Sequence, residues 1–151
     1  MDEVFKIKIE HEISRIDKLL SDVDPLLKLC KLREKPEIIE ITAAAQVLHS
    51  FYNGIESIIV LFLKNMDEKI PNDFRWHKTL LEMMFGANSK DKKILNENIK
   101  NNLENYLSFR HFIRHSYSSE LDWKIMGPLV KEIGNIWNSI KHDFRLFMEN
   151  N

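Results

Sequence analysis

The sequence predicts an all-α protein, an up-and-down antiparallel bundle of four long helices plus one short helix. Glycine and proline contribute only four residues each to the 151, too few for a sandwich or barrel, which needs turn residues about every 8–12 positions. Apolar residues also recur in steps of three and four along most of the chain, the spacing that places them on one helical face. The length suits a single domain over residues 1–151.

Two long helices are expected in the first half of the chain. The first covers residues 3–20 or extends further. At Asp24-Pro25 the chain either kinks or starts a new helical turn, because proline suits the first helical position. The second covers about residues 36–65 and carries two adjacent apolar stripes, which is typical of a helix that is central in its bundle or shared with a partner subunit.

Three further helices are expected in the second half, one short and two long. They cover about residues 75–85, 89 to the pattern-breaking segment 116–122, and 128–148. Gly86 is well placed to end the short helix, and Asn88 or Ser89 can cap the next one. Residues 122–127 could add a turn before the last helix.

Charge and composition exclude several classes of protein. With 22 basic and 23 acidic residues, the chain lacks the positive surplus of proteins that coat nucleic acid, and the cluster Lys90–Lys93 is expected to be a solvated face. The single cysteine, Cys30, can form neither an intramolecular disulfide nor a cysteine-based zinc site, which fits a reducing cytoplasm. The N-terminus is charged throughout, unlike a signal peptide, and the most apolar stretch, residues 55–63, is interrupted by Glu56 and too short for a membrane span. We therefore expect a cytoplasmic protein with no membrane association.

One segment departs from ordinary bundle composition. Phe109–Tyr117 (FRHFIRHSY) contains two arginines, two histidines and a tyrosine near the end of a predicted helix. Arg110 falls on the apolar stripe, where an unpaired buried guanidinium would cost several kcal/mol. Arg110 must therefore either pair with a carboxylate, for which Glu56 and Glu104 are candidates, or line a polar cleft.

His115 follows Arg110 by five residues, which separates the two by about 140° around an unbroken helix. They can face one ligand only if the helix loosens near His115, as the serines after it suggest, or if two copies of the chain meet across a symmetry axis. His111 and His115 also have the spacing of two metal ligands. However, the segment lacks the glutamate of the H-E-x-x-H motif, and Arg114 would repel a cation, so no metal site is expected.

These residues resemble a known family. Arg110, His115 and Tyr117 match the R-x4-6-H motif of HEPN domains, in the R-x4-H-x-Y form of the HepT-like ribonuclease toxins. Three other segments are similar to that family and occur in the same order: Phe51–Glu56, Trp76-His77 followed by Leu80-Leu81, and Glu120–Trp123 before Pro128–Val130. The resemblance spans about residues 44–130, and outside it the chain matches only in helical character.

The resemblance implies an all-helical homodimer whose two motifs face each other at the subunit interface. It also implies metal-independent RNA cleavage without a cofactor, and a minimal nucleotidyltransferase antitoxin that can transfer AMP to the motif tyrosine. Carried over to this sequence, Arg110 and His115 are the catalytic residues and Tyr117 is the modification site. Weaker candidates for support around the cleft are Asn53, Glu56, His77 and Arg114.

The residue types suit this chemistry. Histidine, with an ordinary pKa of about 6.5, can move protons between the RNA 2'-hydroxyl and the leaving 5'-oxygen. Arginine stays charged and can hold two phosphate oxygens at once. Two alternatives remain: a non-catalytic helical subunit that binds a nucleotidyltransferase or its substrate, and a purely structural bundle in which Arg110 forms an internal ion pair and Tyr117 is a core aromatic. The nuclease hypothesis requires Arg110 and His115 to share an open cleft.

Overall fold

The computed structural model describes all 151 residues and consists of helices joined by loops. The α-helices are α1 (Glu3–Asp22), α2 (Asp24–Leu32), α3 (Ile38–Asn65), α4 (Trp76–Met83), α5 (Lys100–Ile113) and α6 (Trp123–Asn150). Short 3-10 turns at Glu97–Ile99 and Ser118–Glu120 precede α5 and α6. No strand is present, which confirms the all-α prediction.

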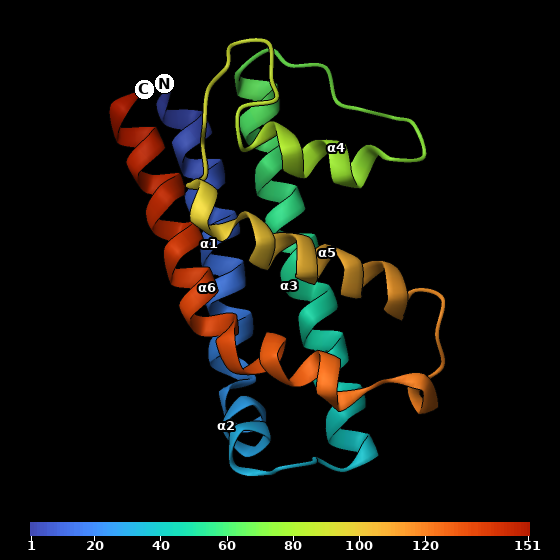
Figure 1. Cartoon of the computed structure of the whole chain (residues 1–151). Helices are drawn as coiled ribbons and strands as arrows, with labels where there is room; N and C mark the ends of the chain where they lie inside the picture. The colour runs from blue at the N-terminus through green and yellow to red at the C-terminus, as the bar shows by residue number, and fades with distance from the viewer.

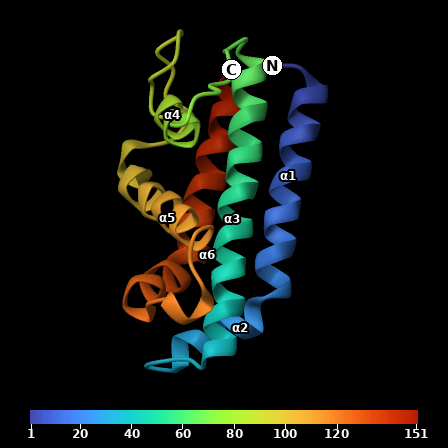
Figure 2. The same ribbon diagram turned by 90° about the vertical axis from the view of Figure 1, so that its right-hand side faces the viewer.

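Helix α3 is the centre of the bundle and contacts each of the other five α-helices. Helices α1 and α6 run alongside it, α1 antiparallel and α6 parallel, and α5 crosses it obliquely (Figures 1 and 2). Both predicted apolar stripes are buried, with Tyr52 and Ile55 on one and Phe51 and Ile58 on the other all fully enclosed. By length and composition α3 could cross a membrane, but it is mostly buried by its neighbours, as the central helix of a bundle is.

Aromatic side chains hold the long helices together. Near one end, Phe62 of α3 packs against Phe5 of α1 and against Phe144 and Phe147 of α6, with ring centroids 5.1–5.7 Å apart. About three turns earlier in α3, Phe51 makes edge contacts with Tyr106 of α5 and Trp137 of α6, with ring centroids 5.4 Å and 6.1 Å apart. Such pairs add about 0.5–1.5 kcal/mol each beyond the area they bury.

Polar contacts of Asp17 link α1 to α6. Asp17 accepts hydrogen bonds from the Trp137 indole at 2.7 Å and the Lys141 ammonium at 2.9 Å. Partial burial of Asp17 opposes its ionisation, but these two donors outweigh that effect and lower its pKa.

Cys30 of α2 is fully buried, and mainly for that reason the pKa of its thiol is raised.

Two helix starts, at Pro25 and before Pro128, settle what the sequence left open, and the start of α5 differs from the expected one. Pro25 starts a separate helix, α2, because proline lacks the N–H that a helix interior requires. Helix α5 begins at Lys100, well after Asn88, because the Asn88 amide instead donates to the carbonyls of Met83 and Lys92 and stabilises a loop. The exposed Lys90–Lys93 cluster lies in this loop.

Helix α6 begins at Trp123, so the turn that residues 122–127 could add is present, and Pro128 lies inside the helix. The first turns of α6 are set at an angle to the rest of the helix (Figure 1). An interior proline removes one backbone hydrogen bond and its ring displaces a carbonyl of the preceding turn, which accounts for the bend.

Gly54 permits the close approach of α1 to α3. A Cβ atom at this position would lie 2.8 Å from Cγ1 of Ile16, whereas one at Gly134, an exposed position in α6, would meet nothing within 4 Å. We expect Gly134→Ala to raise the free energy of unfolding by about 0.5–1 kcal/mol, since alanine is the better helix former. Gly54→Ala should gain less or lose stability, because Ile16 must shift. Urea unfolding measures the free energy of unfolding of both variants. Equal stabilisation by the two would show that α1 can move away from α3 without cost.

Candidate functional site

Arg110 lies in the last turn of α5, with only 9% of its surface exposed. Its Nε donates a hydrogen bond of 2.8 Å to Oδ1 of Asn53, and its Nη1 lies 3.4 Å from Nε2 of His77. The Glu56 carboxylate, with Oε1 3.9 Å from the Arg110 Nε, supplies the opposite charge. Of the two candidate partners, Glu56 is therefore the one used, whereas Glu104 is exposed.

His77 connects the carboxylate to the guanidinium. Its Nδ1 lies 2.6 Å from Oε2 of Glu56, and a carboxylate can only accept in such a contact, so we assign the proton to Nδ1. In the neutral imidazole this leaves a lone pair on Nε2, which faces Nη1 of Arg110. Glu56, His77 and Arg110 thus form a continuous chain of contacts between α3, α4 and α5.

Asn53 is fixed in the same way from within α3. Its Nδ2 lies 3.1 Å from Nε2 of His49, one helical turn earlier, while its Oδ1 accepts from Arg110. Burial, followed by the charges of Arg110 and Arg114, lowers the pKa of His49, which favours the neutral imidazole, the form that can accept from Asn53. Arg114, exposed just beyond the end of α5, therefore influences the cluster by its charge.

A surface hollow of about 530 Å³ opens onto this cluster. Its lining comes from four helices: Glu12 of α1; Asn53, Glu56, Ser57, Val60 and Leu61 of α3; Trp76 of α4; and Arg110 of α5. Nη2 of Arg110 has no partner within the protein and is not among the fully buried unpartnered atoms. The hollow therefore offers a ligand a positioned, partly free guanidinium, the group that binds phosphate through two hydrogen bonds.

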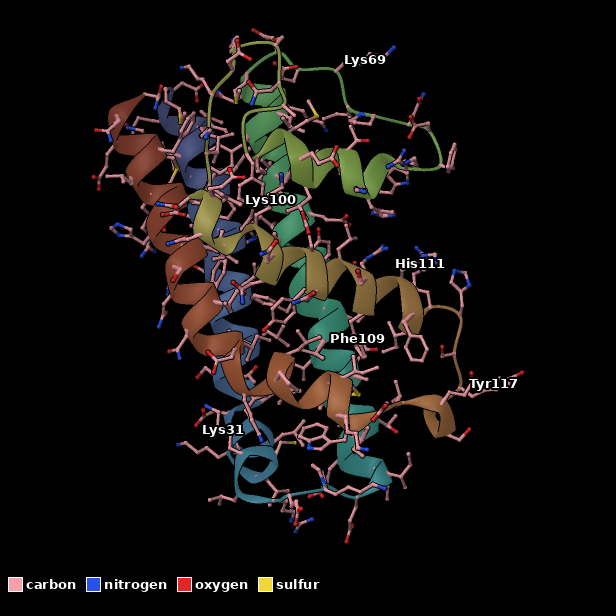
Figure 3. The ribbon with its side chains drawn as sticks, in the orientation of Figure 1. Lys31, Lys69, Lys100, Phe109, His111 and Tyr117 are labelled. Carbon is pink, nitrogen blue, oxygen red and sulfur yellow. The ribbon has the colours of Figure 1, made fainter.

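The end of the motif lies outside this hollow. Helix α5 ends at Ile113, so the loosening expected near His115 is present, and both His115 and Tyr117 are exposed. Tyr117 is 81% exposed and projects from the loop beyond α5, away from the helices (Figure 3). The His115 ring packs against that of His111, with centroids 5.0 Å apart. Within one chain, Arg110 and His115 do not share the hollow.

No group of three or more histidine, cysteine, aspartate or glutamate side chains is arranged to hold a metal ion. The His111–His115 pair thus has no third protein ligand of these types. Zinc sites in proteins usually have three or four protein ligands.

A protein-family model described as "HepT-like protein" matches residues 43–151. The chain belongs to the HepT-like family, within the HEPN superfamily. No curated protein and no solved structure matched the chain. The matched region of this HepT-like protein contains α4 to α6 and all but the first five residues of α3, and so all of Asn53, Glu56, His77 and Arg110. It reaches further towards the C-terminus than the resemblance seen in the motifs.

Three residues of the site were missed by the sequence analysis. His49 has a partner, Asn53, and the spacing of four within one predicted helix was a signal for that contact. Trp76 lines the hollow, although the sequence linked it to the site only through its neighbour His77. Glu12 comes from α1, outside the matched region, and no sequence pattern connects it to Arg110.

The Glu56 contacts give a stability prediction. We expect Glu56→Ala to lower the free energy of unfolding by about 2–3 kcal/mol, because it leaves a buried guanidinium without its opposite charge. Glu104→Ala is the matched control on an exposed position and should change stability by no more than about 0.5 kcal/mol. Chemical denaturation followed by circular dichroism measures both. Equal effects would mean that Glu56 does not stabilise Arg110.

Proposed function

We propose that this HepT-like protein is a metal-independent endoribonuclease, the toxin component of a toxin–antitoxin system that acts in the cytoplasm. The observation that carries the proposal is the fixed guanidinium of Arg110, which lines the hollow and is held by Asn53, His77 and Glu56 through Nε and Nη1, while its Nη2 makes no hydrogen bond within the protein. A guanidinium fixed before the ligand arrives favours the charge that develops on a phosphate during reaction.

The proposed reaction uses the RNA 2'-hydroxyl as nucleophile. The 2'-oxygen forms a bond to phosphorus while the bond from phosphorus to the 5'-oxygen breaks, and a cyclic phosphate results. One imidazole takes the hydroxyl proton and a protonated imidazole gives a proton to the departing 5'-oxygen. Arg110 would hold the phosphate oxygens, and His115 would carry the protons.

A homodimer is part of this proposal, because one chain does not bring His115 to the hollow of Arg110. The partner subunit's His115 would approach Arg110 across the interface. An apolar groove of about 450 Å³ between α5 and the start of α6 supports a subunit contact near the motif. Its walls include the exposed side chains of Phe112 and Ile125.

The second candidate function is a non-catalytic subunit that binds a nucleotidyltransferase or its substrate. The separation of Arg110 from His115 within one chain is the observation that favours it. In that case the buried contacts of Arg110 would serve the fold, and the exposed loop containing Tyr117 would serve as the contact surface.

We expect the purified protein to cleave RNA in the presence of EDTA. Arg110→Ala and His115→Ala should each reduce the rate by about 10²-fold or more, since loss of a fixed donor to the reacting group costs about 10²–10³-fold and general acid–base catalysis contributes about 10²–10⁴-fold. His111→Ala is the matched control, because His111 is an exposed histidine that packs on His115 without belonging to the proposed mechanism. Gel analysis of a labelled RNA measures all three.

Mixing the two inactive variants tests the shared site. If the subunits exchange, a heterodimer of Arg110→Ala and His115→Ala chains contains one intact pair across its interface, so the mixture should regain part of the activity. Intact RNA with the unmodified protein would contradict the nuclease proposal. Unchanged cleavage by His115→Ala would remove that residue from the mechanism.

We also propose that a nucleotidyltransferase antitoxin neutralises the protein by transferring AMP to Tyr117. The phenol oxygen would attack the α-phosphorus of ATP, pyrophosphate would leave, and the phenol proton would pass to a base of the antitoxin. The 81% exposure of Tyr117 supports access by a second enzyme. An attached phosphate would add negative charge near the motif and repel RNA.

The modification is tested by co-expression with a nucleotidyltransferase encoded next to this protein. Intact-mass measurement should show the addition of one AMP group per chain. Tyr117→Phe should show none, and the modified protein should have lost RNA cleavage. Addition of AMP to Tyr117→Phe would place the modification on another residue.

A further inference from the structure

Trp76 lines the hollow but has no role in the proposed cleavage reaction. It is the first residue of α4, it is half-buried, and it lines the same hollow as Arg110. Its ring stacks on the imidazole of His77, with centroids 3.6 Å apart and planes 32° from parallel. One face of the indole is thus covered by the residue that contacts Arg110, which restricts the orientation of the ring in the hollow.

The remaining walls favour an uncharged, flat group next to Trp76. Val60 and Leu61 give apolar contact, and the carboxylates of Glu12 and Glu56 would repel a phosphate anywhere except at Arg110. Glu12 is itself paired with Arg15 at 3.3 Å, and its side chain is only 18% exposed, so it is ordered at the edge of the hollow. A carboxylate can accept hydrogen bonds from the N–H groups of a nucleobase.

The segment just before α4 adds an exposed aromatic ring that is close in sequence to the hollow's α4 wall. Phe74 is 94% exposed, the highest exposure of any large apolar side chain in the protein, and Arg75 beside it is also exposed. Exposed aromatic rings next to arginine are typical of surfaces that bind single-stranded nucleic acid, where each ring stacks on a base.

We propose that the hollow is a nucleobase subsite: an unpaired base stacks on Trp76 while the adjacent phosphate binds Nη2 of Arg110. This inference rests on the proposed function, since it names the substrate class as single-stranded RNA with an unstacked base. A base inside a duplex cannot enter the hollow without leaving its stack, so double-stranded RNA is a poor substrate.

Tryptophan fluorescence gives a direct test that needs no catalysis. Trp76 is half-buried and lines the hollow, whereas Trp123 is 9% and Trp137 2% exposed and neither lines it, so quenching that is lost in Trp76→Phe reports on Trp76. The wild-type protein is titrated with a single-stranded DNA oligonucleotide, which lacks the 2'-hydroxyl, and with an abasic oligonucleotide of the same length. We expect saturable quenching by the first and little by the second. No quenching, or equal quenching by both, would overturn the subsite.

A variant series tests the same subsite through RNA cleavage. Trp76→Ala should raise the KM for single-stranded RNA about 5- to 100-fold, the usual effect of losing one base–aromatic stack. Trp76→Phe keeps a ring and should lie between Trp76→Ala and wild type, and it also removes the quenching signal. Leu32→Ala, an exposed apolar residue outside the hollow, is the control. A wild-type KM for Trp76→Ala would overturn the proposal.

The two proposals fail in different ways. Quenching without RNA cleavage would leave the nucleobase subsite in place and remove the nuclease. Cleavage of RNA without quenching would keep the nuclease and remove the subsite. A Trp76→Ala variant that loses rate at saturating RNA but keeps its KM would show that Trp76 acts only by positioning His77, which also overturns the subsite.

Discussion

The guanidinium of Arg110 can lie inside the bundle because two other helices bring a carboxylate, an imidazole and an amide to it. A buried charge without such partners would cost more than most single contacts in a protein of this size contribute. The position of α5 across α3, and of α4 beside both, is therefore tied to this one group. Moving any of the three helices would leave Glu56 or Arg110 without its partner.

Helix α3 serves both the core and the site. Most of its surface is apolar and enclosed, with Phe51, Ile55 and Phe62 among the fully buried residues. Its polar residues Asn53 and Glu56 lie towards α4 and α5, and they are the ones that contact Arg110 or His77. Because the rest of α3 is fixed by packing, these two side chains are held by a rigid element, which is what a binding site for a phosphate requires.

The sequence predicted the all-α class and narrowed the charged partner of Arg110 to two candidates, for different physical reasons. The stripes on α3 identified a central helix because periodicity reports the buried face directly. The place of Arg110 on an apolar stripe required a carboxylate partner, and Glu56 was one of two candidates. The choice between Glu56 and Glu104 depends on how α5 crosses α3, and the spacing within one helix carries no information about that crossing.

Other features depend on contacts between distant segments. The loop before α5 forms because Asn88 bonds two backbone carbonyls, which outweighs its ability to cap a helix at that point. Glu12 lines the hollow from α1, which packs closely against α3 at Gly54. His77 bridges Glu56 and Arg110, which are 54 residues apart, and such a bridge follows from tertiary packing.

The enclosure of Cys30 has a practical consequence for studying assembly. A fully buried thiol whose pKa is raised reacts slowly with maleimide or methanethiosulfonate reagents. A cysteine placed by substitution on the surface, for instance in the loop after α5, would then be the one site to accept a spin label. In a symmetric pair of chains the two labels would report the separation of the two loops by dipolar spectroscopy.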